Sequence, residues 1–585
     1  MKTHLNIFLM LTLAYNCSIA QIDNSWLTKF ETSNYLETPR YEETMEYFKR
    51  IDENSDYAKM FSFGISPQGR DLNCIVVSKD KTFNPEEAKK TGKPVIFIVN
   101  GIHSGEIEGK DACMLLLREI LITKEKENLI DNTILVIVPI FSVDAHERFR
   151  KYNRINQNGP VEMGWRTTAA GLNLNRDWMK ADAVEMQAML KLFSSWLPDF
   201  FVDTHTTDGA DYQYTLTYAI ETLEDVYRET ADFNKNKFIP YLVEKAEKGG
   251  YLIAPYVNFK DWRKGFESGL TEGTAPPRFS TIYSALQNRP GLLVETHMMK
   301  PYKDRVFSTK LTLETVINFS SENADELVAL NKRADVNVVK DYAKDKKYFP
   351  LSLTQTEKAE TSRFMGKAFI KVPSEISGKD KIVYTDKDTV FDVTVYRENY
   401  IKDSVLAPKF YLIPQECSEI IVRMHLHGIK MEQLKNDEEY EVTRYKFLNV
   451  KFDEEPYESR QRVNFDIQSY KEKVKVPAGT FKVNTDQRTI GVILQLLEPA
   501  GEDSFIRWGF FNTIFHLHEY FEDYVMEKTA EEMLKDDPEL KKEFEKKLAE
   551  DENFRNDPNA RLAYFYERSP YYDDHYRIYP VMRVE

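Results

Sequence analysis

Four residues of this chain carry side chains that together could bind a metal ion and move a proton. His103 and Glu106 stand three positions apart after an apolar run at residues 95–99, and His205 and Glu295 each end a later apolar run. Two imidazoles and one carboxylate leave one coordination position of a zinc ion open for water, which is typical of a catalytic zinc site. In the alternative interpretation, both histidines are polar strand-end residues that bond to the backbone.

The three apolar runs predict the elements that must bring these side chains together. Each run is short and rich in β-branched residues, which indicates a buried strand. A helix is expected at residues 107–122, after the first run, and another one ends near residue 197, before the second run. Alternating strands and helices predict an α/β fold with a mixed, mostly parallel sheet and helices on both faces. Ligands of such sheets bind at the carboxyl ends of the strands, where the four side chains would meet.

The order of these residues is similar to that of a known enzyme family. His103-x-x-Glu106 is followed by Leu-Asn-Leu-Asn-Arg-Asp-Trp at residues 172–178, and then by His205 and Glu295. In order and spacing this resembles the carboxypeptidase A family of zinc metallopeptidases, over roughly residues 40–330. The resemblance implies a carboxypeptidase-like catalytic domain that holds one Zn²⁺ per chain through His103, Glu106 and His205.

The same resemblance implies that Glu295 is the general base. Its place at the end of an apolar strand matters, because burial raises the pKa of a carboxylate and a nearby metal lowers it. The two effects can leave Glu295 able to take a proton from the attacking water and return it to the leaving amine. The alternative is a buried glutamate that hydrogen bonds satisfy.

Asn175 and Arg176 match the family positions that grip the free C-terminal carboxylate of a peptide, and Arg176 is expected to act in catalysis as well. The planar, permanently charged guanidinium group suits this role. The alternative interpretation is a structural ion pair between Arg176 and Asp177.

Two further family roles are harder to place. The arginine that stabilises the oxyanion could be Arg166, Arg154 or Arg148, and their positions in the loop region favour Arg166 or Arg154. Arg166 and Tyr283 are expected to bind substrate, Tyr283 as the side chain that closes over it.

Charge and the N-terminal residues limit the possible partners and the compartment. The net charge of −15 argues against nucleic-acid binding, which favours basic surfaces. An apolar run at residues 5–13, with small residues at 18–20, predicts a cleavable signal peptide over residues 1–20 and a secreted or periplasmic enzyme. No later stretch reaches the 18 or so apolar residues that a membrane span needs.

A chain of 585 residues is too long for one hydrophobic core. We expect a catalytic domain at residues 21–335, a β-rich accessory domain at 336–503 and a helical C-terminal segment at 504–585. Apolar runs at residues 368–372, 410–413 and 489–494 predict strands of the accessory domain, and residues 540–548 predict a helix of the last segment.

These observations predict a zinc metallocarboxypeptidase that hydrolyses C-terminal peptide bonds with metal-activated water and a glutamate base. Its partner would be a peptide with a free C-terminal carboxylate. One alternative is a peptidoglycan stem-peptide hydrolase, or another amide hydrolase, that uses the same site. An alternative of another class is a non-catalytic binding protein with a carboxypeptidase-like fold.

Overall fold

The computed structural model describes residues 23–273 and 275–585. The predicted signal peptide at residues 1–20 lies outside the described residues. Within the described part of the chain, no helix is both long and apolar enough to cross a membrane.

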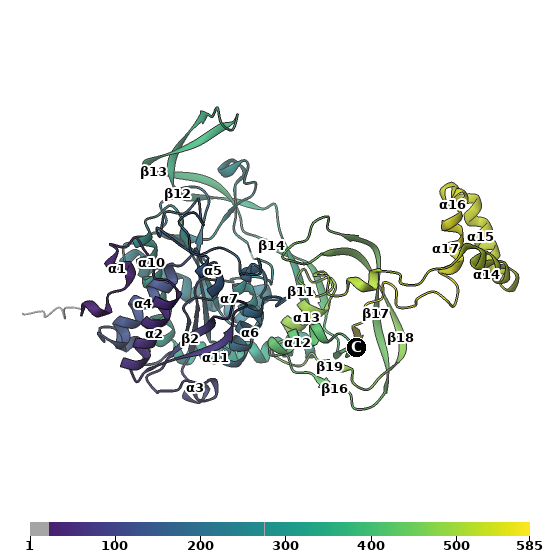
Figure 1. The fold of residues 1–585 in the computed structure, drawn as a ribbon, viewed down its shortest axis with the longest axis horizontal. Coiled ribbons are helices and arrows are strands. Elements are labelled where there is room, and N and C mark those ends of the chain that lie inside the picture. The colour runs from purple at the N-terminus through teal and green to yellow at the C-terminus, as the bar shows by residue number, and fades with distance from the viewer. Residues whose placement is uncertain (1–22, 274) are drawn as a thin grey trace, which may run out of the picture.

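An eight-stranded mixed sheet forms the centre of the N-terminal half, residues 23–345 (Figure 1). Its strand order is β1-β2-β4-β3-β5-β10-β6-β7, and β4, β3, β5 and β10 run parallel to one another. The predicted mixed, mostly parallel sheet is confirmed. The strands are β1 (Ala58–Ile65), β2 (Asp71–Val77), β3 (Val95–Val99), β4 (Ile134–Val138), β5 (Phe200–Thr207), β6 (Leu216–Ala219), β7 (Ile253–Pro255) and β10 (Gly291–His297).

Helices cover both faces of this sheet because its central strands are apolar on both sides. Along β3, Phe97 joins the core with α6 and α9, whereas Ile96 and Ile98 join the core with α2, α4 and α10. Helix α4 approaches the sheet closely at Gly109, where a Cβ atom would collide with Asn100 and Thr204. The helices of this half are α1 (Lys29–Thr32), α2 (Tyr41–Asn54), α3 (Pro85–Thr91), α4 (Glu108–Leu121), α5 (Val143–Glu147), α6 (Val184–Trp196), α7 (Glu224–Phe233), α8 (Ile239–Lys248), α9 (Ser280–Leu286), α10 (Tyr302–Glu322) and α11 (Ala324–Val338).

The C-terminal half comprises residues 346–585, and its part from residue 348 to residue 484 is rich in strands, as predicted. A six-stranded sheet has the order β16-β19-β15-β20-β17-β18, so the last strand of the chain lies inside it. The long hairpin β12–β13 stands out from the molecule in Figure 1 and pairs with β9 of the N-terminal half. The strands of these sheets are β8 (Asn258–Phe259), β9 (Leu270–Thr271), β11 (Tyr348–Gln355), β12 (Ala359–Pro373), β13 (Asp380–Tyr396), β14 (Asn399–Leu406), β15 (Phe410–Ile413), β16 (Glu432–Gln433), β17 (Glu438–Phe452), β18 (Val463–Val476), β19 (Phe481–Asn484) and β20 (Met582–Val584).

One hydrophobic core runs through both halves. The cluster that holds Trp178 and Phe193 under the main sheet continues to Phe349, Ile493 and Phe505. The two halves therefore bury apolar surface against each other, and removal of apolar surface from water is the main driving force for folding. The predicted domain boundary at residue 335 stays a prediction.

The strand that the sequence predicts at residues 489–494 is wrong. Ile490–Leu497 instead form helix α13, which is buried on all sides. A short apolar run that is buried all round has no period by which sequence could separate strand from helix. Helix α12 (Ser418–Leu426) also belongs to this half.

The helices near the C-terminus form a separate lobe at one end of the molecule in Figure 1. They have an apolar core of their own around Phe544 and Phe565. The chain leaves and re-enters the six-stranded region at one place, since Arg577 N donates to Ile514 O at 2.8 Å. The helices are α14 (Asp523–Asp536), α15 (Pro538–Glu550), α16 (Glu552–Asn556) and α17 (Pro558–Tyr566).

Candidate active site

The four side chains that the sequence singled out meet at the carboxyl ends of three neighbouring strands. His103 and Glu106 lie in the loop that joins β3 to α4. His205 lies in β5 and Glu295 in β10, and the parallel register of these strands places the two residues directly opposite each other. The sheet topology thus brings these four side chains to one edge of the sheet, as expected.

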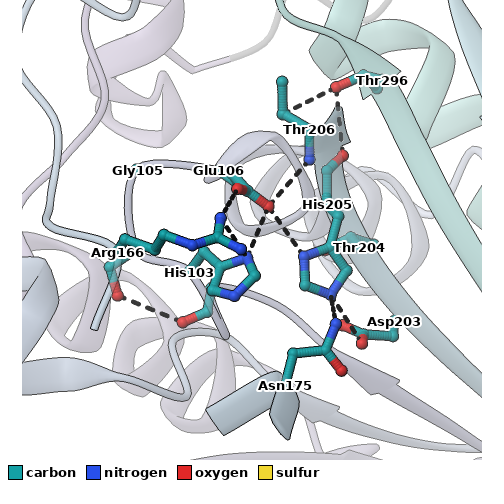
Figure 2. Close-up of polar contacts among 12 residues, drawn as sticks. His103, Gly105, Glu106, Arg166, Asn175, Asp203, Thr204, His205, Thr206 and Thr296 are labelled. Carbon is teal, nitrogen blue, oxygen red and sulfur yellow. Dashed lines mark hydrogen bonds and ion pairs between the residues drawn. The ribbon is translucent and has the colours of Figure 1, made fainter. Parts of the chain in front are cut away.

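His103, Glu106 and His205 form a buried cluster whose possible ligand atoms all lie within 4.8 Å of one another. Figure 2 shows both rings turned toward the Glu106 carboxylate. Glu106 Oε2 lies 3.1 Å from His103 Nδ1 and 2.9 Å from His205 Nδ1. Thr206 N also donates to this oxygen, at 3.2 Å.

The opposite nitrogen of each ring is held by a polar side chain. His103 Nε2 lies 2.9 Å from Asn173 Oδ1, and His205 Nε2 lies 2.8 Å from Asp203 Oδ2. Both oxygens are acceptors, so in the neutral form of each ring the proton stays on Nε2 and Nδ1 offers its lone pair to a metal. Such partners of metal-binding histidines fix both the tautomer and the ring orientation.

The charges in this cluster are strongly coupled. Burial lowers the pKa of His103. Burial acts in the same direction on His205, but the Asp203 carboxylate overrides it and raises the pKa of this imidazole well above its ordinary value. Burial would raise the pKa of Glu106, yet His103 and Arg154 hold it well below the ordinary value. The site therefore favours an ionised Glu106 and can concentrate positive charge beside it.

Exclusion of solvent raises the pKa of Glu295 to about 8, although the neighbouring His205 acts to lower it. A carboxylate with a pKa near neutrality can both accept and return a proton. A bound cation would lower this pKa further, because it favours the charged form.

Two arginines contact the other oxygen of Glu106. Arg154 Nη1 lies 2.9 Å and Arg166 Nη1 3.2 Å from Glu106 Oε1. The stem of Arg154 passes over Gly105 so closely that a Cβ atom at this position would collide with it. Of the three arginines considered from sequence, Arg148 instead stacks on the Trp165 ring, 4.2 Å from its centroid.

A cavity of about 450 Å³ opens onto the cluster, and we call it the metal-site cavity. An adjoining recess of about 240 Å³ shares Thr207, Asp208 and Tyr256 with it. The metal-site cavity is lined by His103, Glu106, Asn153, Arg154, Ile155, Asn156, Trp165, Arg166, Thr206, Thr207, Asp208, Tyr256 and Glu295.

Asn175 contacts His205 of the cluster, whereas neither Asn175 nor Arg176 lines the metal-site cavity. Asn175 Nδ2 lies 3.3 Å from His205 Nε2, and its Oδ1 accepts from Ser280 N. Arg176 donates to its neighbour's carbonyl at 2.7 Å and stacks on the Phe279 ring, 4.1 Å from the centroid.

The alternative pairing of Arg176 with Asp177 is not what the structure contains. Asp177 is fully buried and forms an ion pair with Lys180 at 2.5 Å, and it also accepts from the backbone N–H groups of residues 182 and 183. Its charge is thus used inside the fold, and Arg176 stays available to a ligand.

Tyr283 does not lie where a substrate could reach it, so its expected role as a closing side chain must be corrected. Its ring is fully buried in α9 against Trp178, with centroids 5.3 Å apart. Its hydroxyl group lies 3.0 Å from His427 Nδ1 of the C-terminal half. The whole of α9 is buried between the sheet and the C-terminal half, which sequence could not indicate.

Sequence reasoning did not identify Asn173, Asp203 and Tyr256 as parts of the site. Asp203 had a usable signal, because residues two apart in a strand point to the same face and His205 follows at that spacing. Asn173 and Tyr256 come from loops, whose path depends on the rest of the fold.

The donor set fits a zinc ion. Neutral imidazole nitrogens and one carboxylate are ordinary zinc ligands, and three protein ligands leave a position for water or substrate. The oriented Nε2 partners of both rings are also typical of zinc sites.

Comparisons with known proteins agree with this chemistry. Residues 44–238 match the family model described as zinc carboxypeptidase, a span that includes His103, Glu106 and His205 and ends before Glu295. Carboxypeptidase 2 of Trichophyton tonsurans is 21% identical over 494 residues, which cover 80% of this chain and 84% of that protein. Carboxypeptidase 2 of Trichophyton rubrum is 21% identical over 492 residues, with the same coverage.

Among solved structures, a metallo-carboxypeptidase from Burkholderia cenocepacia is similar at 16% identity and a TM-score of 0.36. The matched part covers 48% of this chain and 70% of the chain of that protein. Carboxypeptidase A from Helicoverpa armigera is similar at 15% identity and a TM-score of 0.34. The matched part covers 51% of this chain and 74% of the chain of that protein. The family match and the named relatives confirm the resemblance to zinc carboxypeptidases and the prediction that the chain is a peptidase.

We expect one zinc ion per chain, and the His205→Ala variant should lose it. Loss of a direct ligand should weaken zinc binding by more than the roughly 10- to 100-fold that removal of an outer partner costs. Elemental analysis of dialysed protein measures the zinc content. His575→Ala is the matched control, because His575 belongs to the exposed cluster Asp573–His575, the other group of possible ligands among the described residues. Full zinc occupancy in His205→Ala, or loss in His575→Ala, would overturn the ligand assignment.

Proposed function

We propose that this chain, whose residues 44–238 match the zinc carboxypeptidase family, is a zinc-dependent metallocarboxypeptidase that removes residues from the C-terminus of peptides. The observation that carries the proposal is the meeting of His103, Glu106, His205 and Glu295 around one cavity. A binding protein that had lost its chemistry would have no reason to keep both the ligand set and a carboxylate poised opposite His205.

His103, Glu106 and His205 would hold the zinc ion. When bound, this ion polarises a carbonyl group and lowers the pKa of water. Glu295 takes the proton from the attacking water, while the water oxygen bonds to the carbonyl carbon. Glu295 then returns the proton to the amine nitrogen as the carbon–nitrogen bond breaks, so one carboxylate serves as base and as acid.

Arg154 and Arg166 are the residues that would stabilise the negative charge on the carbonyl oxygen. Both guanidinium groups line the metal-site cavity and already contact a carboxylate oxygen there. Donors that are in place before the reaction stabilise the developing charge without a cost of reorganisation. Arg166 is the more exposed of the two and can also contact substrate.

Arg176, with Asn175 beside it, would anchor the terminal carboxylate. The stack on Phe279 fixes the plane of the Arg176 guanidinium group. A guanidinium group held in one plane can bind a carboxylate through two parallel hydrogen bonds. This anchor is what would make the enzyme an exopeptidase rather than an endo-acting amide hydrolase.

The recess beside the metal-site cavity supports a preference for large apolar side chains. It is continuous with that cavity through Tyr256, so a substrate at the metal could extend into it. Aromatic rings bury much apolar surface and favour a partner ring. Its aromatic lining consists of Tyr212, Tyr256, Phe259, Trp262, Phe266 and Phe364.

We also propose that the enzyme is exported, as the apolar run at residues 5–13 supports. N-terminal sequencing of the exported protein should give Gln21 as its first residue. A mature protein that still begins with Met1 would contradict this.

The Glu295→Gln variant should bind zinc and peptide as the wild type does but lose most of its turnover. The amide cannot accept the proton, and removal of a general base costs roughly 100-fold or more in rate, or about 3 kcal/mol of barrier. Steady-state kinetics together with zinc content measure this. Glu162→Gln, an exposed change elsewhere in the loop region, is the control. Turnover within tenfold of the wild type would assign the base to another residue.

Paired peptides with a free or an amidated C-terminus should separate the exopeptidase from its alternatives. The free acids should be cut, fastest when the last residue is phenylalanine or tryptophan, and the amides should resist. Arg176→Ala should slow cleavage of the free acids far more than it affects the amides, because an unpaired polar group in a binding site costs more than a missing apolar contact. Mass spectrometry of the digests gives both results. Equal cleavage of both peptide series would favour an endo-acting amide hydrolase, and no cleavage of either would favour a binding protein.

A further inference from the structure

The loop between β17 and β18 contains a turn whose residues do not suit its conformation. Tyr457 and Arg460 exchange backbone hydrogen bonds of 2.9 and 3.1 Å around Glu458 and Ser459. Both central residues have positive φ, 49° and 64°, which makes a two-residue hairpin turn of the type that normally contains Asn-Gly. Positive φ is unfavourable for Glu and Ser, because their Cβ atoms clash with the backbone in this conformation. Unfavourable backbone persists where surrounding contacts enforce it, often for function.

Glu458 uses this position to contact the segment that carries the metal site. Its Oε2 accepts from Asn173 N at 3.0 Å, across the junction between the two halves. The side chain of the same asparagine accepts from His103 Nε2 and from Asn175 N, at 2.9 and 3.0 Å. A carboxylate of the C-terminal half thus fixes the backbone of the residue that orients a metal ligand.

The C-terminal half also holds the other end of this segment, residues 173–182. Arg460, the last residue of the turn, donates to both oxygens of Asp182, at 2.6 and 2.9 Å. Arg423 Nε donates to Lys180 O at 2.7 Å, and His427 Nε2 lies 3.0 Å from Met179 O. The segment that contains Asn175 and Arg176 is therefore clamped at both ends by residues more than two hundred positions away.

We propose that Glu458 is a positioning residue of the metal site and that the β17–β18 turn is a working part of the active centre. By fixing the backbone of Asn173, Glu458 keeps the side-chain oxygen Oδ1 of Asn173 on His103 Nε2. It so keeps the lone pair of His103 Nδ1 directed at the metal position. This role gives the C-terminal half a part in the chemistry. It depends on the proposed function only for the identity of the metal.

The Glu458→Asn variant separates positioning from stability. Asparagine suits positive φ, so the turn itself should be as stable as before or more so. Its side chain is one methylene shorter and uncharged, so it cannot reach Asn173 N as Glu458 does. The thermal midpoint of the metal-free protein should stay equal or rise, zinc should bind about tenfold more weakly, and kcat should fall with it.

Three further variants complete the experiment. Glu458→Gln keeps the length and the acceptor oxygen, so its zinc affinity should stay within about threefold of the wild type, since only charge assistance is lost. Asn173→Ala should weaken zinc by roughly 10- to 100-fold as the reference for a lost outer partner. Glu455→Ala, an exposed change in the same loop, should alter nothing.

Zinc dissociation constants from competition with a chromophoric chelator, thermal unfolding and steady-state kinetics are the measurements. Zinc affinity and kcat of Glu458→Asn within twofold of the wild type would overturn the proposal. So would a loss of affinity that follows a lower thermal midpoint in both Glu458 variants, because that result describes a structural contact only. If the wild type binds zinc but cuts no peptide, the proposed function fails, while the zinc measurements still decide the role of Glu458.

Discussion

The buried carboxylate of Glu106 is the group on which the rest of the site depends. A carboxylate removed from water is costly unless charges and hydrogen-bond donors surround it. Here one oxygen faces both imidazoles and a backbone N–H, and the other faces Arg154 and Arg166. These partners come from the loop after β3, from β5 and from the loop region before residue 173. The sheet must therefore be complete before the cluster can form.

The partners of the histidines extend this dependence outward. Asp203 lies two residues before His205 in the same strand, so the strand itself sets its position. Asn173 lies on a loop segment and needs support from elsewhere, which Glu458 and the other C-terminal contacts supply. The apolar core that runs from Trp178 to Phe505 joins the two halves beneath the same segment. The C-terminal half is consequently packed against the site and continuous with its core.

The charged residues at positions 176–180 lie in two different environments. Asp177 and Lys180 neutralise each other inside the fold, and Asp177 also holds the backbone of the turn that leads to Asp182. Arg176 is free of that pair and rests on an aromatic ring. Of these neighbouring charges, Asp177 and Lys180 are thus used inside the fold, whereas Arg176 has no such ion pair among the described residues. The division follows burial, because a buried charge needs a fixed partner whereas a half-exposed one can exchange water for a ligand.

The sequence by itself determined the parts of this protein that depend on local pattern. Apolar runs with polar ends predicted β3, β5 and β10, and the order of His103, Glu106, His205 and Glu295 predicted the metal cluster, because parallel strands bring their carboxyl ends to one edge. Only the tertiary structure decided what depends on distant packing. It buried Tyr283 under the C-terminal half, made residues 490–497 a helix and brought Glu458 to Asn173. No local period encodes such contacts, since they join segments whose separation in sequence carries no signal of their separation in space.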